Sequence, residues 1–142
     1  MEQTRKAIAT WSGNLAEGKS TVKAGTSGAF PEMATTWKAR TEEAGGLTSP
    51  EELLAAAHAS CYSMAFSNEL SKAGHTVESI DTKADVSFQP GQGITGSHLT
   101  TRASVPGISQ EEFAEIAEKA KKGCPVSSAL TGTTITLDAA LA

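Results

Sequence analysis

Small and apolar residues gather in one long stretch in the middle of the chain. Ser49 suits a helix N-cap, Glu52 completes a capping box with it, and Gly74 supplies a left-handed stop after the last turn. Residues 53–66 are apolar or small on every side, and a helix without a polar face is buried all round. The pattern therefore predicts a long buried helix over residues 50–73. Because one short chain has little material to wrap it, we expect a second subunit to cover part of it across a two-fold axis.

Shorter patterns of alternating or helically spaced apolar residues flank this stretch. Strands are predicted over residues 5–11, 19–24, 34–40, 76–88, 94–105 and 133–141. A second capping box at Ser109 and Glu112 opens a helix, and Pro125 opens a short one. The order of three strands, a helix, two strands, two helices and a strand predicts a single α+β domain over residues 1–142. We expect an antiparallel sheet to cover the helices.

Charge and the lack of long apolar runs argue against nucleic acid and membrane as partners. The chain has 142 residues and a formal net charge of −4, with no basic stripe that could neutralise phosphates. The N-terminus lacks an apolar signal core, and no run reaches the ~18 apolar residues of a membrane span. We therefore expect a cytoplasmic protein that binds neither nucleic acid nor membrane.

Two cysteines are the candidates for chemistry. Cys61 lies in the long helix and Cys124 at the start of a short one. In a reducing compartment such a pair is structural, metal-binding or redox-active. A helix N-terminus favours the thiolate of Cys124, whereas burial raises the pKa of Cys61 unless a cation lies close. On these grounds alone Cys124 is the more reactive, although Arg40 is a permanently charged group that could act on Cys61.

A metal site is the next possibility, because His58 and Cys61 form an i, i+3 pair. The other histidines, His75 and His98, belong to no ligand cluster. We therefore expect no metal, and we expect His58 to be a hydrogen-bonded core histidine.

Three segments resemble the OsmC/Ohr family, in particular its OsmC (osmotically inducible protein C) branch: TSPEELLAAAHASCYSMA, KAKKGCPVSSAL and TITLDAAL. The likeness also includes WSGNLAEGKSTV near the start. The resemblance implies an OsmC-like fold, with antiparallel sheets around a central helix, in an intertwined homodimer whose active sites lie at the interface. It further implies a thiol-dependent peroxidase without a cofactor that reduces organic hydroperoxides, and hydrogen peroxide more weakly.

The resemblance also assigns roles to four residues. It makes Cys61 the peroxidatic cysteine, Cys124 the resolving cysteine, Glu51 the catalytic glutamate and Arg40 the catalytic arginine. The Cys61 thiolate would attack the peroxide, while Arg40 stabilises the developing charge and Glu51 holds the guanidinium or positions the hydroperoxide. The resulting sulfenic acid would condense with Cys124 to a disulfide. An external dithiol, for which dihydrolipoamide is a candidate, would reset the enzyme.

The position of the activating charge leads to a further expectation. If Arg40 points away, Arg5 or Arg102 could replace it. Glu51 lies ten residues before the cysteine of the same helix, about 15 Å along its axis. We therefore expect Arg40 and Glu51 from one subunit to meet both cysteines of the other.

An apolar pocket around the peroxidatic cysteine would suit alkyl or fatty-acid peroxides. Its candidate residues are Leu53, Leu54, Met64, Phe66 and Trp37. Two other functions stay open. A dithiol–disulfide oxidoreductase acting on proteins is disfavoured by the lack of a CxxC motif, and a dimeric binder of small apolar ligands would leave both thiols idle.

Overall fold

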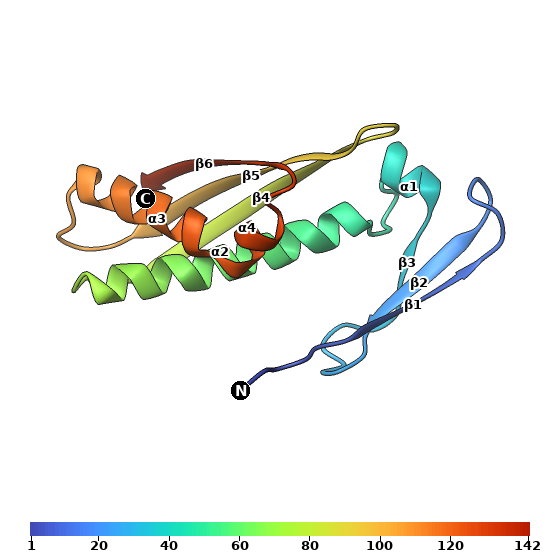
Figure 1. Ribbon diagram of the computed structural model, residues 1–142, viewed down its shortest axis with the longest axis horizontal. Coiled ribbons are helices and arrows are strands. Elements are labelled where there is room, and N and C mark those ends of the chain that lie inside the picture. The colour runs from blue at the N-terminus through green and yellow to red at the C-terminus, as the bar shows by residue number, and fades with distance from the viewer. The chain divides into compact units, whose positions relative to one another are not determined.

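The structure is a computed structural model that describes all 142 residues (Figure 1). The chain divides into two compact units, Met1–Leu53 and Leu54–Ala142. The expectation of one domain over the whole chain stays a prediction. In chain order the elements are β1 (Ala7–Ser12), β2 (Lys19–Ala24), β3 (Met33–Thr35), α1 (Trp37–Thr41), α2 (Pro50–Lys72), β4 (Ser79–Gln89), β5 (Gly93–Ser104), α3 (Gln110–Gly123), α4 (Pro125–Ala129) and β6 (Thr134–Leu141).

The first unit is built on a three-stranded sheet in the order β1-β2-β3. The strands predicted over residues 5–11 and 19–24 are confirmed, and they form a hairpin: β1 and β2 pair antiparallel, with Ala7 opposite Ala24 and Ser12 opposite Lys19. All six residues of β1 are exposed. This sheet therefore has no covered apolar face along its first strand.

The strand predicted over residues 34–40 is wrong for most of its length. The strand β3 ends at Thr35, and the short helix α1 follows. Thr36 has extended backbone angles, and its side chain accepts a 3.0 Å hydrogen bond from the Ala39 N–H. A threonine in this position is a helix N-cap, and that local hydrogen bond turns the chain into a helix where the alternation suggested a strand.

The long helix α2 is confirmed to within one residue of its predicted end. Ser49 Oγ accepts a 3.1 Å hydrogen bond from the Glu52 N–H, as the capping box requires. The Glu52 carboxylate, however, accepts a 2.7 Å bond from the Thr48 hydroxyl. After the last turn Gly74 has a φ of 87°, a conformation that glycine adopts without strain.

The second unit contains the sheet β4-β5-β6, with α2 and α3 on one face (Figure 1). The strands β4 and β5 form an antiparallel hairpin, but β5 and β6 run parallel. The expectation of an antiparallel sheet is therefore wrong for this last pair. Two helices, α3 and α4, connect β5 to β6, and a connection of that length returns the chain to the same end of the sheet.

The apolar core of this unit lies between the sheet and the helices. The helix α2 contributes residues spaced four apart along one side, all with no exposed surface: His58, Tyr62, Phe66 and Leu70. The rings of Phe66 and Phe113 of α3 meet at 5.2 Å, edge to face. The other side of α2 is open, since Ser60 is exposed and Met64 has 70% of its surface exposed. Within a single chain α2 is therefore not buried on every side, because the sheet and α3 cover only one side of it.

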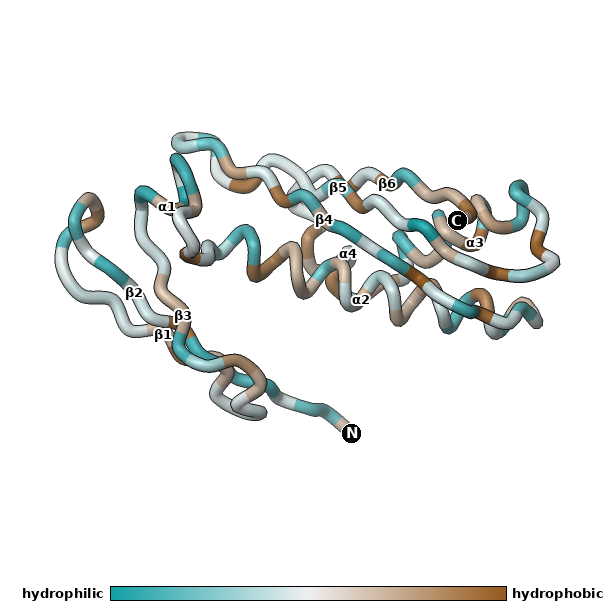
Figure 2. Tube along the Cα trace, turned by 180° about the vertical axis from the view of Figure 1, so that it is seen from behind, coloured by the Kyte–Doolittle hydropathy of each residue, from teal (hydrophilic) through white to brown (hydrophobic).

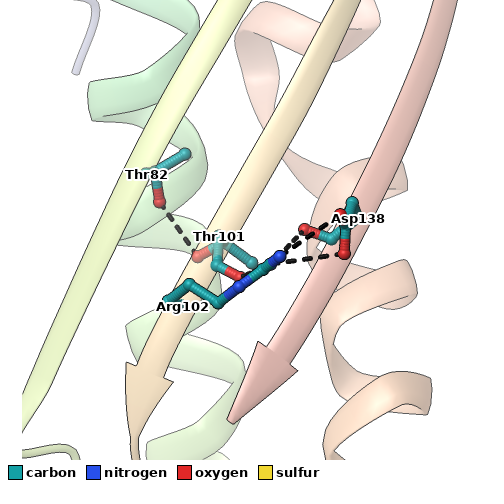
Figure 3. A network of polar contacts seen from close by, with 4 residues as sticks. All are labelled: Thr82, Thr101, Arg102 and Asp138. Carbon is teal, nitrogen blue, oxygen red and sulfur yellow. Dashed lines mark hydrogen bonds and ion pairs between the residues drawn. The ribbon is translucent and has the colours of Figure 1, made fainter. Parts of the chain in front are cut away.

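The two faces of the second sheet differ in polarity. Hydrophilic and hydrophobic residues alternate along β4 (Figure 2), and its burial alternates in step. On the exposed face Arg102 pairs with Asp138 at 3.2 Å, whereas Thr101 is fully buried and bonds to Thr82 (Figure 3). The sheet therefore shields the core on one side and presents charge on the other. None of the helices combines the length and the apolar character that a membrane span needs.

Candidate active site

The two cysteines lie next to each other in the second unit. Cys61 is half-buried near the middle of α2 and packs against the core, and Cys124 is fully buried immediately before α4. Both are free thiols, and their side chains are hydrogen-bonded to each other. The fold thus brings together two thiols that are 63 positions apart in the sequence.

Local sequence explains where Cys124 stands. The helix α3 ends at Gly123, and the Cys124 N–H still donates a 2.9 Å bond to the Ala120 carbonyl. Cys124 itself has extended backbone angles (φ −65°, ψ 124°) and is the N-cap of α4, with Pro125 at the first helical position. The junction of the two helices therefore fixes the backbone of this cysteine on both sides.

The surroundings of Cys61 disfavour its charged form. Burial raises the pKa of the Cys61 thiol, and the hydrogen bond with Cys124 raises it further. The backbone N–H of Val126, in the first turn of α4, bonds to Cys61 and lowers the pKa. The expected effect of burial on the Cys61 pKa is confirmed. The sequence predicts that the N-terminus of this short helix favours the thiolate of Cys124, whereas its Val126 N–H acts on Cys61. Only knowledge of how α4 packs on α2 could have revealed this contact.

Arg40 and Glu51 form a two-pronged ion pair in the first unit. Arg40 Nε donates to both carboxylate oxygens of Glu51, at 3.0 and 3.2 Å, and Nη2 donates to Oε1 at 2.7 Å. The Glu51 side chain is 8% exposed and that of Arg40 28%. The guanidinium carbon also lies 6.0 Å from the centre of the Trp37 ring. Such a fork fixes the orientation of the guanidinium plane and keeps the carboxylate charge compensated.

The two alternative arginines are engaged elsewhere. Arg102 pairs with Asp138 on the exposed face of the β4-β5-β6 sheet (Figure 3). Arg5 is exposed and donates to the Thr4 carbonyl and the Gln3 side chain. Within the second unit, Arg102 therefore lies on the side of the sheet opposite the core that contains Cys61.

The predicted substrate-pocket residues fall into two groups. Trp37, Leu53 and Leu54 are half-buried, and Met64 is exposed. Met64 lines an open groove of about 650 Å³ between α2 and the start of β4, and the other α2 residues that line it are polar, namely Ser63, Ser67, Asn68 and Ser71. Phe66 is different, because it has no exposed surface and packs between the rings of Tyr62 and Phe113. Phe66 is therefore a core residue, since a side chain enclosed in this way does not face an open pocket.

His58 is a satisfied core histidine, as the sequence predicts. Its Nδ1 lies 2.6 Å from Ser97 Oγ of β5, and its Nε2 lies 2.8 Å from Ser127 Oγ of α4. Burial lowers the pKa of His58, so the neutral form is favoured. The two serine partners were not identified from the sequence, in which they lie 39 and 69 positions away.

Comparison with known proteins places this geometry in a family. The family described as OsmC-like protein matches residues 43–138, which include both cysteines and Glu51. The chain is also 45% identical over 137 residues to the Peroxiredoxin OsmC of Escherichia coli, an alignment that covers 94% of each chain. The chain belongs to the OsmC-like protein family. A Peroxiredoxin OsmC of Shigella flexneri matches to the same extent.

Solved structures of the OsmC-like family share the fold. An OsmC-like protein from Mycoplasma pneumoniae matches with a TM-score of 0.73 at 17% identity, over 99% of both chains. The organic hydroperoxide resistance protein OhrB of Bacillus subtilis matches with a TM-score of 0.67 at 20% identity, over 95% of this chain and 98% of that one. The expected α+β, OsmC-like fold is thus confirmed, with corrections in the pairing of β5 with β6 and in the segment 34–40, most of which is helical.

Proposed function

We propose that this OsmC-family chain is a thiol-dependent peroxidase that reduces organic hydroperoxides to alcohols. The observation that carries the proposal is the contact between two free thiols, Cys61 and Cys124, which lie on different helices of one unit. A curated relative of 45% identity bears the name peroxiredoxin. A peroxidase that forms an internal disulfide needs this arrangement, because the second thiol must reach the oxidised sulfur of the first.

The reaction proceeds in three balanced steps. The Cys61 thiolate attacks one oxygen of the hydroperoxide, the O–O bond breaks, and the alcohol leaves with a proton while Cys61 becomes a sulfenic acid. The Cys124 thiol then displaces that hydroxyl as water, and the Cys61–Cys124 disulfide forms. An external dithiol, with dihydrolipoamide as a candidate, reduces the disulfide and is itself oxidised to a cyclic disulfide.

A thiolate is favoured by a nearby positive charge, and none of the groups that shift the Cys61 pKa is a cation. Burial raises the Cys61 pKa, and the Val126 N–H only partly opposes this. In the proposal, the guanidinium of Arg40 supplies the charge and Glu51 fixes its orientation through the two-pronged ion pair. Arg40 then also stabilises the negative charge that develops on the leaving oxygen.

A homodimer completes the site in this proposal. Arg40 and Glu51 of one subunit face Cys61 and Cys124 of the other. The exposed side of α2, with Met64 at 70% exposure, supports the presence of a second copy, as does strand β1, in which every residue is exposed. Ile8, Trp11 and Met64 are large apolar side chains on these surfaces, and a partner would cover them.

The proposed substrate class rests on the apolar residues that we expect to surround the sulfur in the dimer. Trp37, Leu53, Leu54 and Met64 are the apolar residues that we propose to contact the organic part of the hydroperoxide. An apolar wall binds an alkyl or fatty-acid chain but gains nothing from hydrogen peroxide, so organic hydroperoxides are the better substrates. Because the cycle begins from two free thiols, we place the protein in a reducing compartment, the cytoplasm.

One assay tests the function. The protein is mixed with dihydrolipoamide and either cumene hydroperoxide or hydrogen peroxide, and the loss of peroxide is followed. We expect faster loss of cumene hydroperoxide, and no loss with Cys61→Ser. Activity that survives this substitution would exclude the thiol mechanism. A wild-type protein that consumes no peroxide with any dithiol would favour the apolar-ligand binder, and one that reduces protein disulfides would favour the dithiol–disulfide oxidoreductase.

A further inference from the structure

His58 connects three elements around the two cysteines. It has no exposed surface, lies three residues before Cys61 on α2, and bonds through its two ring nitrogens to Ser97 of β5 and Ser127 of α4. Both serines are buried, with 1% and 4% of their surface exposed. The imidazole therefore ties α4 to α2 on one side and to the sheet on the other.

The helix α4 needs such an attachment. It has only five residues, and a helix of one turn or so is not stable without tertiary contacts. The side chain of its N-cap, Cys124, makes no capping hydrogen bond. The orientation of α4 is therefore set by what its side chains contact, and the Ser127–His58 bond is a directional contact to α2.

Two groups that act on the reactive sulfur belong to the same turn as Ser127. Val126, whose N–H bonds to Cys61, is the residue before it, and Cys124 lies three residues earlier. We propose that His58 is a positioning residue. Its hydrogen bond to Ser127 holds the first turn of α4 in place, so that the Val126 N–H and the Cys124 thiol keep their contact with the Cys61 sulfur. This inference rests on the proposed peroxidase function and adds a residue to it.

The chemical consequence concerns the fate of the sulfenic acid. Cys61–SOH can lose water with the Cys124 thiol to form the disulfide, or it can react with a second hydroperoxide, which becomes an alcohol while the sulfur becomes a sulfinic acid. The first route depends on the position of Cys124 and the second does not. Loosening α4 therefore shifts the outcome towards overoxidation.

Ser127→Ala and Ser97→Ala provide a matched pair of variants. Each removes one buried hydroxyl that is bonded to the same imidazole, but only Ser127 belongs to α4. Both variants should lose similar stability to urea. The sulfinic acid formed per turnover, measured by intact mass at rising cumene hydroperoxide, should increase about fivefold in Ser127→Ala, the factor for one lost hydrogen bond. Ser97→Ala should stay near the wild-type value.

A second readout separates positioning from general destabilisation. The pKa of Cys61, measured from the pH dependence of its alkylation in the reduced protein, should rise in Ser127→Ala because the Val126 N–H no longer bonds to the sulfur. Ser127→Thr, which keeps the hydroxyl, should restore both readouts. If Ser127→Ala does not fold, His58→Gln is compared with Ser97→Ala in the same way.

Equal effects of the two serine variants on overoxidation and on the Cys61 pKa would overturn the inference and leave His58 a purely structural residue. Failure of the proposed function looks different, because the wild-type protein would then form neither a sulfenic acid nor a disulfide. A wild type that cycles normally, beside serine variants that behave alike, would contradict only the role of His58.

Discussion

The two units of the chain differ in what keeps them folded. Every buried apolar residue belongs to the second unit, where α2, α3 and the sheet enclose a core. The buried side chains of the first unit are polar, namely Ser20, Thr48 and Glu51, and its strand β1 is exposed throughout. A three-stranded sheet without a covered apolar face has little stability of its own. The first unit therefore depends on contacts outside itself.

The proposed catalytic groups are also split between the two units. Both sulfur atoms lie in the unit with the core, where packing fixes their separation. The charged pair, Arg40 and Glu51, lies in the unit without one. In the proposed mechanism, disulfide formation would thus depend on one packed unit, whereas activation of the thiol would depend on assembly of the dimer.

Removing the reactive sulfur should have the largest effect. Cys61→Ser should lower peroxide reduction by about 10³-fold or more, as loss of a nucleophile does. Cys124→Ser should keep a single turnover, because the first sulfur can still be oxidised, and then accumulate sulfinic acid on Cys61. Stopped-flow measurement of the first turnover distinguishes the two variants. A normal first turnover in Cys61→Ser would remove this residue from the mechanism.

Truncation of one aromatic residue in each unit tests the difference in packing. Phe113→Ala removes a fully buried ring that contacts Phe66, and it should lower the free energy of unfolding by about 3–5 kcal/mol. Trp11 is 43% exposed on β1. Trp11→Ala should therefore lower the free energy of unfolding far less than Phe113→Ala, but it should weaken self-association. Urea unfolding measures the first effect and sedimentation at several concentrations the second. A Trp11→Ala protein that self-associates like the wild type would contradict the role given to β1.

Two arginines, each paired with a carboxylate, test the role of the charge. Arg40→Met should lower kcat/KM roughly 100-fold, because the leaving oxygen and the thiolate lose their positive partner. Arg102→Met removes an equal charge from the exposed sheet face and should change kcat/KM little. Steady-state kinetics with cumene hydroperoxide gives both values. Similar losses in the two variants would mean that general electrostatics, and no specific contact of Arg40, supports the reaction.

The pH dependence of stability should show the smallest effect. Burial lowers the pKa of His58 in the folded protein, so below pH ~6.5 the unfolded chain binds a proton that the folded chain does not. Stability should therefore fall as the pH drops below that value, by at most about 1.4 kcal/mol per pH unit, until the lowered folded pKa is reached. Urea unfolding at pH 7 and pH 5 should show a smaller loss in His58→Gln than in the wild type. The same substitution at the exposed His98, His98→Gln, is the control for loss of a histidine at the surface.

Elements with strong local signals could be predicted from the sequence. The caps at Ser49 and Ser109 located two helices, because each hydroxyl does accept the N–H three residues on. The hairpin β4-β5 starts three residues later than predicted at one strand and one residue earlier at the other. In the segment 34–40, a single Thr36 cap changed the structure from strand to helix, and weak alternation gave no warning of it.

Features that depend on packing could not be predicted. The parallel pairing of β5 with β6 follows from how α3 and α4 fill the connection, which no local pattern encodes. The carboxylate of each expected capping box binds elsewhere, Glu52 to Thr48 and Glu112 to His75. For the site, the resemblance named residues that the structure brings into two contacts, Arg40 with Glu51 and Cys61 with Cys124. It did not reveal the Val126 N–H, which belongs to the backbone and leaves no mark in the sequence.

The most direct test of the peroxidase proposal is the mass of the reduced protein after one equivalent of cumene hydroperoxide, followed by peptide mapping. The account predicts a loss of about 2 Da per chain and a single peptide pair that joins Cys61 to Cys124. An unchanged mass with the peroxide intact, or oxygen added to methionine with both thiols still free, would contradict it.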